Sequence, residues 1–329
     1  MRVAAVIPTW NRADLLAELL ASLALQTRPF DEIIIVDNGS SDNSAEVAQF
    51  HNARWIALGQ NQGFAPAVNR GIEAAQSHWI AILNNDVTLT PTWLQALLES
   101  LTCGTGFSPC TFATGKILSA ANPTLIDATF DELARSGCAW RCGSGKPDCL
   151  IWNTPRQIRI APMTAALFKT DLFKTVGLLD ETFESYLEDI DFGVRTSLAG
   201  FQGLYVPQAV AHHRGSATLG EWNPDTVRRI SRNQVRLIQK YFAGEPRFPI
   251  MAGQLLWGFL ALRHGRGWSY MRGKFEGLRS GPSGKEDLKR QGKPSLSPLL
   301  RASEQTIFNL QKQTGFDRYW RAYFWLSPP

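Results

Sequence analysis

Acidic side chains stand at two places in this sequence where they could do chemistry. The first is Asp86, which follows the apolar run Trp79–Leu83 and is preceded by Asn84 and Asn85. A carboxylate at the end of a buried strand can hold Mg²⁺ or Mn²⁺ through its oxygens, and such an ion can neutralise a diphosphate. Because aspartates also cap strand ends for structural reasons, Asp86 by itself indicates only a candidate site.

The second acidic place is the run Glu188-Asp189-Ile190-Asp191, at the start of a predicted helix over Glu188–Leu198. Crowded carboxylates repel one another, which raises the pKa of at least one of them and suits a general base. The alternative is structural, since acids in a first turn also interact favourably with the helix dipole.

Two histidines and one further aspartate complete the candidates. His212 and His213 follow a predicted strand at Leu204–Pro207. An imidazole near a carboxylate-bound ion can serve as an additional ligand, although a single histidine is more often structural. Asp37 follows another strand and could accept hydrogen bonds from a base or a ribose, or cap its own loop.

The first hundred residues alternate strand and helix signals, which predicts a parallel α/β sheet. A leucine-rich helix with Asn11 as its N-cap is expected at Ala13–Gln26, and a second helix at Ala65–Ala75. Strands are expected at Val3–Ile7, Ile33–Val36, Trp55–Leu58 and Trp79–Leu83.

Polar residues follow each of these four strands. The segments are Pro8–Asn11, Asp37-Asn38, Asn61–Gly63 and Asn84–Asp86. Ligands of open α/β sheets bind beyond the carboxyl ends of the strands, so four polar ends at one edge indicate a binding site.

The same motifs, in this order, resemble family 2 glycosyltransferases of the GT-A fold. The resemblance extends from residue 1 to about residue 245, and it is greatest to the rhamnosyltransferase-like branch, whose members often read Asn-Asn-Asp at the metal motif. The segments that carry it are Val3–Arg12, Ile35–Asp42, Asn61–Gly71, Leu83–Asp86, Gly177–Phe183, Tyr186–Phe192 and Val206–Ser216.

The resemblance implies a role for each candidate. Asp86 would hold the divalent ion together with His212, a role that His213 could take instead, and Asp189 would be the catalytic base. Two asparagines replace aspartates in the metal motif, which lowers the negative charge of the site. The nucleotide-sugar donor would be bound by Pro8, Thr9, Asn11, Asp37, Asn61, Asn69 and Asn84.

The activity that follows is an inverting, metal-dependent transfer of a sugar to a hydroxyl of a saccharide or lipid-linked saccharide, in cell-envelope polysaccharide synthesis. One base and no enzyme nucleophile mean inversion. Thymidine-diphosphate rhamnose is the expected donor, with a uridine-diphosphate hexose or galactofuranose as the alternative.

The charge distribution predicts two domains. Residues 1–219 carry 15 Lys and Arg against 21 Asp and Glu, whereas residues 220–329 carry 19 against 8. The first would be the GT-A catalytic domain and the second a helical, basic, aromatic-rich region. Its apolar stretch Ile250–Leu262 has 13 residues, too few for a span of about 20.

Arginines and aromatic residues around that stretch predict contact with an anionic membrane surface, the alternative being a helical hairpin that packs on the catalytic domain. No motif for nucleic acid is found. No signal peptide is recognised at Met1–Pro8, and five cysteines are typical of free thiols in a reducing compartment, so we expect a cytoplasmic protein on the inner face of the membrane.

Two other classes of protein fit the sequence less well. A nucleotidyltransferase would need a glycine-rich phosphate loop after the first strand, and Pro8–Arg12 contains no glycine. An inactive sugar-nucleotide-binding subunit would have no need of Asp86, Asp189 and His212 together.

Overall fold

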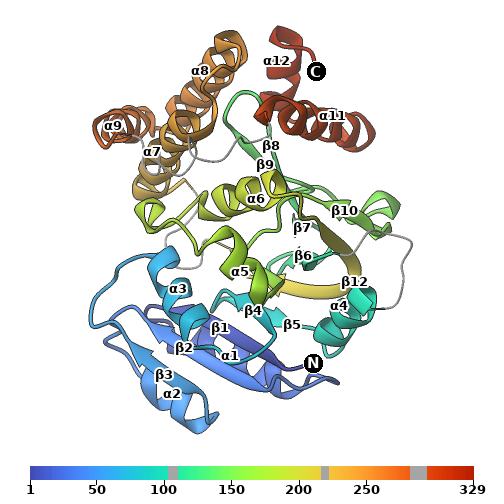
Figure 1. Cartoon of the computed structure of the whole chain (residues 1–329). Coiled ribbons are helices and arrows are strands. Elements are labelled where there is room, and N and C mark those ends of the chain that lie inside the picture. The colour runs from blue at the N-terminus through green and yellow to red at the C-terminus, as the bar shows by residue number, and fades with distance from the viewer. Residues whose placement is uncertain (103–109, 216–221, 282–294) are drawn as a thin grey trace. The chain divides into compact units, whose positions relative to one another are not determined.

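The computed structural model of the chain has the predicted alternation of strands and helices in its first hundred residues (Figure 1). It describes residues 1–102, 110–215, 222–281 and 295–329. The chain forms two compact units, of which the first comprises Met1–Phe130 and Gly143–Thr218, and the second Asp131–Cys142 and Leu219–Pro329. The division into domains 1–219 and 220–329 stays a prediction about function. The short segment 131–142 goes with the second unit.

The first unit contains most of the strands. Its N-terminal elements are β1 (Val3–Thr9), α1 (Ala13–Ala24), β2 (Glu32–Asp37), α2 (Ser44–Phe50), β3 (Arg54–Ala57), α3 (Phe64–Ala74), β4 (Trp79–Leu83), β5 (Val87–Leu89) and α4 (Trp93–Thr102). The elements that follow are β6 (Phe112–Ser119), β7 (Ile126–Ala128), a 3-10 turn (Leu150–Asn153), β10 (Arg156–Ile158), β11 (Ala165–Lys169), α5 (Thr170–Val176), a second 3-10 turn (Glu181–Phe183), α6 (Glu188–Leu198) and β12 (Gly203–His213).

These strands form one mixed sheet in the order β10-β12-β6-β11-β4-β1-β2-β3, with β5 paired to β12 and β7 to β6. The pairs β1–β2, β1–β4 and β2–β3 are parallel, as the sequence predicts. Beyond β4 the sheet is not parallel throughout, because β11 runs antiparallel to both β4 and β6. A parallel pair needs a crossover connection, usually a helix, whereas the chain between β6 and β11 forms short strands and one 3-10 turn.

Strand alternation directs the apolar side chains of β2 to both faces of the sheet. Ile35 joins a core cluster with Leu16 and Leu19 of α1. Ile34 and Val36 point the other way, against Ala67 of α3. Helices therefore cover both faces, which explains why the strands of this half read as continuous apolar runs.

Strand β12 carries the two histidines. A glycine on the neighbouring strand β6 allows an irregularity in the pairing of the two strands. The pairing of β12 with β6 shifts register between Val206 and Val210. A Cβ atom on Gly115 of β6 would lie 1.8 Å from the carbonyl oxygen of Ala209. Only glycine permits this approach, so Gly115 allows the bulge beyond which β12 continues to His213.

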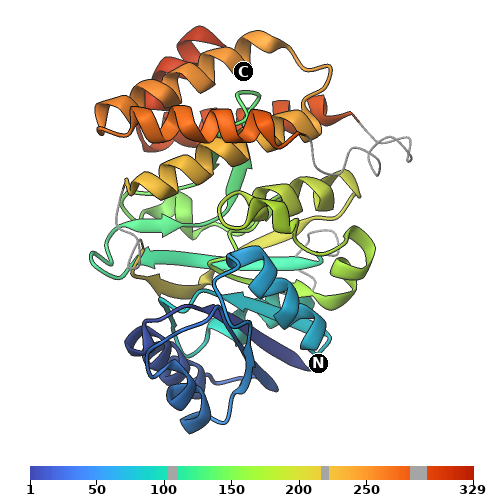
Figure 2. The same ribbon diagram turned by 90° about the vertical axis from the view of Figure 1, so that its left-hand side faces the viewer.

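The second unit is a helical assembly built around a short hairpin. Its elements are β8 (Asp131–Leu133), β9 (Ala139–Arg141), α7 (Pro224–Tyr241), α8 (Arg247–Arg263), α9 (Gly267–Arg279), α11 (Leu296–Thr314) and α12 (Arg318–Leu326). Figure 2 shows its helices in orange and red, and among them α9 packs against both α7 and α8. Helix α7 begins with a side-chain cap from Asn223 followed by Pro224, and both residues favour a helix start. Among the described residues, no helix is long and apolar enough to cross a bilayer.

One buried carboxylate of this unit is paired with an arginine. The carboxylate of Glu304 is fully buried and forms an ion pair with Arg135, whose backbone N–H also donates to it at 2.9 Å. The hydroxyl of Tyr323 donates to the same carboxylate. Buried ions persist where such bonds satisfy them, so these contacts hold the turn of the hairpin to α11 and α12.

Lys274 of α9 lies in a different polar cluster. Its ammonium group donates to the side-chain oxygen of Gln234 at 2.8 Å and to that of Gln254. The side-chain amides of both glutamines contact Cys138 at 3.5 Å. Burial disfavours the ammonium ion and lowers the pKa of Lys274 to about 8.

Candidate functional site

Hydrogen bonds join the ends of β1, β2 and β4. The backbone oxygen of Thr9, at the end of β1, accepts from the N–H of Asn38 at 2.8 Å. The hydroxyl of Thr9 accepts a hydrogen bond from the side-chain amide of Asn85 at 3.0 Å. Thr9 is buried. The strand ends that the sequence expects at one edge are therefore in direct contact.

Pro8 lies within β1 although a proline removes one bond from a strand ladder. It pairs in register with Val36 of β2. The register of β1 with β4 ends at Val6 and Ile82, so the missing N–H falls beyond that ladder. Pro8 is buried, and its contact with a donor stays a prediction.

Asn11 does not cap α1, contrary to the sequence prediction. Its side-chain oxygen instead accepts from the backbone N–H of Ser41 at 2.9 Å. Asn11 and Arg12 both adopt left-handed backbone angles, with φ of 54° and 67°. The N–H of Ala13 donates to the carboxylate of Asp42 at 2.8 Å, so a residue distant in sequence does the capping.

Asp37 has the structural role that the sequence left open for it. Its carboxylate accepts from the N–H of Ser40 at 2.9 Å and is 5% exposed. Capping this loop leaves further acceptor positions on the same carboxylate, so binding of a nucleoside by Asp37 stays a prediction.

The loop before α3 is tied both to β2 and to the segment before α6. The side-chain amide of Asn38 donates to the carbonyl of Gly63 at 3.1 Å, and Asn61 accepts from the N–H of Gly63 at 3.0 Å. The N–H of Ala65 donates to the carbonyl of Glu184 at 2.8 Å. Gly63 has φ of 102°, and a Cβ atom there would lie 2.8 Å from that carbonyl. A glycine is therefore required at this junction.

The structure gives Asn69 a packing role. Its side-chain oxygen accepts from the N–H of Leu179, and its amide donates to the carbonyl of Leu179 and to Glu181, each at 2.9 Å. The residue is 2% exposed. With both ends of the amide engaged, we expect no donor contact from this side chain, unlike Asn61, which is exposed.

Asp86 is in contact with a histidine, and that histidine is His213. The distance from Asp86 Oδ1 to His213 Nε2 is 3.1 Å. His212 is the neighbour on the same strand, and successive side chains of a strand point to opposite faces. The geometry thus favours His213 over His212 as the partner of Asp86, an alternative that the sequence left open. Asn84, two residues before Asp86, is half-buried.

Asp127 of β7 holds the other side of the His213 ring. Its carboxylate lies 2.9 Å from His213 Nδ1. Burial disfavours the imidazolium ion, but hydrogen bonds to Asp127 and Asp86 outweigh it and raise the pKa of His213 to about 9. The metal-free protein therefore carries a protonated His213 between two carboxylates at neutral pH.

The donor atoms at this place fit a hard divalent ion. Carboxylate oxygen and imidazole nitrogen are accepted by Mn²⁺, and Mg²⁺ prefers the oxygen. A ligating histidine usually has a carboxylate on its other nitrogen, as His213 has Asp127. In the ranges that the structure describes, no group of three or more His, Cys, Asp or Glu side chains is arranged so that it could hold a metal ion. Asp86 and His213 would thus supply two ligands, and diphosphate oxygens and water the others.

The three acids at the start of α6 differ in environment. Asp191 is fully buried and pairs with Arg195 at 3.0 Å. Arg195 also donates to the carbonyls of Val176 and Leu178, so this pair is structural. Asp189 is half-buried. Of the three acids it is therefore the one that is partly exposed at the position predicted for the catalytic base.

The backbone before Asp189 is strained. Glu184, Tyr186 and Leu187 have φ of 60°, 72° and 68°. Non-glycine residues adopt this region at a cost and cluster at functional sites. The hydroxyl of Ser185 accepts from the N–H of Phe64 at 3.1 Å, so the segment is tied to the start of α3.

The sequence alone did not predict that Asp127 contacts the histidine or that Arg12 lies near Asp86. Asp127 lies outside the segments that carry the family resemblance, although Ile126-Asp127-Ala128 alternates as a half-exposed strand does. The pKa of Arg12 is raised, first by a hydrogen bond to Asp14 and in smaller part by the charge of Asp86. A cation therefore lies near the acid that would hold the metal.

Comparison with known sequences identifies the N-terminal part. Residues 4–109 match the sequence profile of glycosyl transferase family 2. The N-acetylglucosaminyl-diphospho-decaprenol L-rhamnosyltransferase of Mycobacterium tuberculosis is 29% identical over 238 residues, which cover 65% of this chain and 76% of that protein. The chondroitin synthase of Escherichia coli is 28% identical over 264 residues, 71% of this chain and 38% of that protein.

Comparison with solved structures identifies the fold. GalNAc-T7, crystallised with UDP, GalNAc and Mn²⁺, superposes with a TM-score of 0.60 at 14% identity, covering 78% of this chain and 51% of that one. The mannosyltransferase PcManGT of Pyrobaculum calidifontis, in complex with GDP-Man and Mn²⁺, superposes with a TM-score of 0.52 at 16% identity, covering 98% and 85%. The predicted GT-A fold is confirmed.

Proposed function

Because the chain is a family 2 glycosyltransferase of the GT-A fold, we propose that it transfers a sugar from a nucleoside diphosphate to an acceptor hydroxyl, with inversion and with a bound divalent ion. The observation that carries this proposal is the contact of Asp86 with His213, oriented by Asp127, at the edge where β1, β2 and β4 end. Two solved neighbours contain Mn²⁺ with a nucleotide, which supports the divalent ion.

Asp86 and His213 would hold the ion, and Asp127 would keep the ring of His213 in the ligating orientation. A divalent ion at this place neutralises charge that develops on the departing nucleoside diphosphate. Arg12, which is also paired with Asp14, lies near enough to Asp86 for its pKa to be influenced by that charge, and it would add a second positive charge beside the diphosphate.

Asp189 would take the proton from the acceptor hydroxyl as that oxygen attacks the anomeric carbon. The loop of left-handed residues before it, tied to the start of α3, fixes where α6 begins. With one carboxylate acting as base and no enzyme nucleophile assigned, a single displacement inverts the anomeric configuration.

The donor and acceptor follow from the relatives. The mycobacterial relative is named for rhamnosyl transfer to an N-acetylglucosaminyl-diphospho-lipid. We therefore take thymidine-diphosphate rhamnose as the first donor and a lipid-linked saccharide as the acceptor, in cell-envelope polysaccharide synthesis. A lipid-linked acceptor requires a site at a membrane, and we place the enzyme on its cytoplasmic face.

The test is a thermal-shift screen with thymidine-diphosphate rhamnose, UDP-glucose, UDP-GalNAc, UDP-galactofuranose and GDP-mannose, each with Mn²⁺, with Mg²⁺ and with EDTA. A ligand that binds only the native state raises its stability, by about 2.7 kcal/mol at a concentration of 100 times its Kd. We expect one donor to raise the melting temperature with the metal and not with EDTA.

Two variants test whether the metal-dependent shift requires the proposed metal site. Asp86→Asn should lose the metal-dependent part of the shift, whereas His212→Gln, on the opposite face of β12, should keep it. If no donor changes the melting temperature under any metal condition, the proposed donor site is wrong. If a donor shifts it equally with EDTA, the proposed ion is wrong while the activity stands.

A further inference from the structure

Helix α8 has one packed face and one exposed apolar face. On the packed face, Gly253 lies so close to the hairpin turn that a Cβ atom there would be 2.2 Å from the Cβ of Ser136. The opposite face is spaced as one helical stripe, at intervals of three and four residues. Its members are 59–68% exposed, and they are Phe248, Met251, Leu255, Phe259 and Leu262.

Helix α9 repeats this arrangement. Gly273 and Gly277 bring it against α7, since Cβ atoms there would lie 2.1 Å and 2.7 Å from the backbone oxygens of Arg228 and Arg232. The face turned away from α7 is again apolar and spaced by three and four residues. It consists of Trp268 (81% exposed), Met271, Phe275 and Leu278.

The two stripes lie on neighbouring helices. The hydroxyl of Tyr270 in α9 donates to the carbonyl of Gln254 in α8 at 2.8 Å. Gly258 leaves room for the Tyr270 ring, which a Cβ atom would approach to 2.9 Å. We call the nine exposed residues of the two stripes the α8–α9 face. Nine large apolar side chains, each 55% or more exposed on two helices in contact, are more than the single apolar residues scattered over an ordinary surface, so the face indicates a partner.

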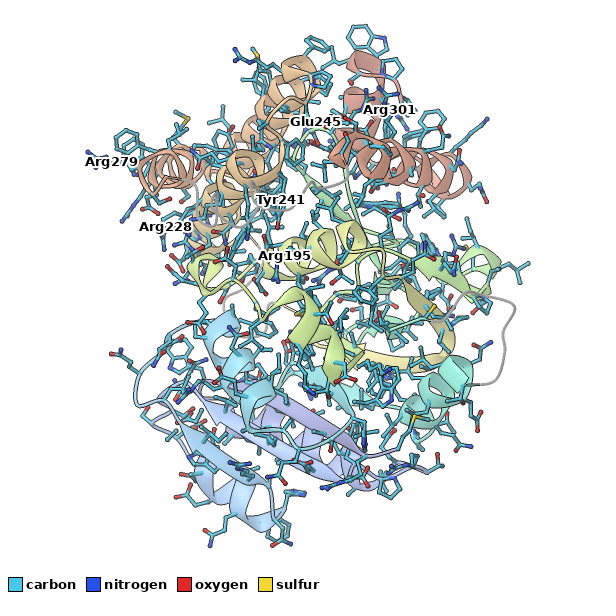
Figure 3. All side chains as sticks on the ribbon, in the orientation of Figure 1. Arg195, Arg228, Tyr241, Glu245, Arg279 and Arg301 are labelled. Atoms are coloured by element: carbon cyan, nitrogen blue, oxygen red, sulfur yellow. The ribbon has the colours of Figure 1, made fainter. Side chains whose placement is uncertain are left out.

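The charge around the α8–α9 face identifies the partner's chemistry. Residues 247–279 contain six Lys and Arg, of which Lys274 is held in the internal cluster with Gln234 and Gln254, and one acid, Glu276. Glu276 is engaged by Arg228 at 2.6 Å and by Arg272 at 2.9 Å. Arg263 is exposed at the end of α8, and Arg279, labelled in Figure 3, is exposed at the end of α9. Arg279 also covers the ring of Phe275, with 4.6 Å to its centroid.

We propose that the α8–α9 face inserts into the interface of an anionic lipid bilayer, with Phe259 and Trp268 among the apolar chains and Arg263 and Arg279 at the lipid phosphates. This inference rests on the proposed function and names the surface that brings the enzyme to a lipid-linked acceptor. Aromatic residues beside basic ones are typical of interfacial helices. A second copy of the chain fits less well, because a two-fold contact over this face would bring its arginines together.

The test measures binding of the full-length protein to vesicles of phosphatidylcholine, and of phosphatidylcholine with one quarter phosphatidylglycerol, by co-flotation. We expect strong binding only to the second, weakened by salt. The double variant Phe259→Ser/Trp268→Ser should bind at least tenfold more weakly. Arg263→Gln/Arg279→Gln should lose about fivefold for each charge.

Matched controls come from the first unit. Phe50 and Leu150 are 84% and 86% exposed, so Phe50→Ser and Leu150→Ser remove similar apolar surface elsewhere and should leave vesicle binding unchanged. Melting temperature reports folding of every variant. The donor-induced thermal shift, measured on the same samples, keeps a failure of the proposed function separate from a failure of vesicle binding.

Three results would overturn the inference. One is equal binding of the wild-type protein to the neutral and the anionic vesicles. Another is equal loss of binding in the face variants and in the matched controls. The third is a concentration-dependent dimer that Phe259→Ser/Trp268→Ser abolishes, because the face would then belong to a second copy.

Discussion

Binding of Mn²⁺ should release a proton from His213, and its affinity should therefore rise with pH. A ligating imidazole must be neutral, so the metal competes with the proton on Nε2. Contacts with Asp127 and Asp86 outweigh burial and raise the pKa of His213 to about 9 in the metal-free protein. Below that pH the ring is charged, and each lower unit of pH costs a further factor of about ten in apparent affinity.

The magnitude follows directly. Between pH 6.5 and 8, the apparent Kd for Mn²⁺ should fall by about tenfold per pH unit, with about one proton released per ion bound. An unperturbed histidine, with a pKa of about 6.5, would give a change of only about twofold over the same range. Isothermal titration calorimetry, at constant nucleoside diphosphate and in two buffers of different ionisation enthalpy, measures both quantities.

Two variants make the measurement specific. Asp127→Asn removes one of the two carboxylates that favour the charged ring, so the dependence on pH should flatten. His212→Gln changes the adjacent residue on the other face of β12 and should leave the dependence intact. An affinity that does not vary with pH, or one that loses its variation in His212→Gln and not in Asp127→Asn, would refute the assignment of His213.

Three further changes have defined outcomes. Asp189→Asn should abolish sugar transfer while the donor-induced thermal shift persists, and retained turnover would remove Asp189 from the role of base. Asn69→Ala should destabilise the protein by about 1–3 kcal/mol in urea unfolding, because it leaves the N–H and carbonyl of Leu179 unsatisfied; an increased KM at unchanged stability would instead support a donor contact. Burial lowers the pKa of Lys274 from its ordinary value of 10.5 to about 8. Below pH 8 the buried ammonium ion therefore lowers the free energy of unfolding. This cost decreases as the pH rises from 8 to 10.5. The stability of the wild-type protein relative to Lys274→Met should therefore rise by on the order of 2 kcal/mol from pH 8 to 10, and a constant difference would show that the ammonium is not desolvated.

Local patterns predicted local structure well. The helix expected at Ala13–Gln26 is α1 (Ala13–Ala24), and the strand expected at Trp79–Leu83 is β4 with the same limits. Buried strands and one-sided helices have distinct periods in the sequence, so they can be read without a partner. Polar residues at the strand ends likewise indicated the edge at which Thr9 and Asn85 meet.

Contacts between distant residues were not predictable in the same way. The cap of α1 comes from Asp42 and not from Asn11, because two left-handed residues turn Asn11 toward Ser41. Segment 131–142 belongs to the helical unit, where Arg135 pairs with Glu304. In both cases the residue that makes the deciding contact is far away in the sequence.

The sequence by itself determined the fold class, the acids Asp86 and Asp189 as candidates, and the resemblance to family 2 glycosyltransferases, because strand ends and the order of motifs can be read along the chain. Only the tertiary structure decided which side chains meet. It placed His213 beside Asp86, brought Asp127 to the other ring nitrogen across 86 positions, and bound Asn69 to Leu179 across 110. The physical reason is that a strand fixes the face of a residue, while the partner on that face depends on how strands far apart in sequence are paired.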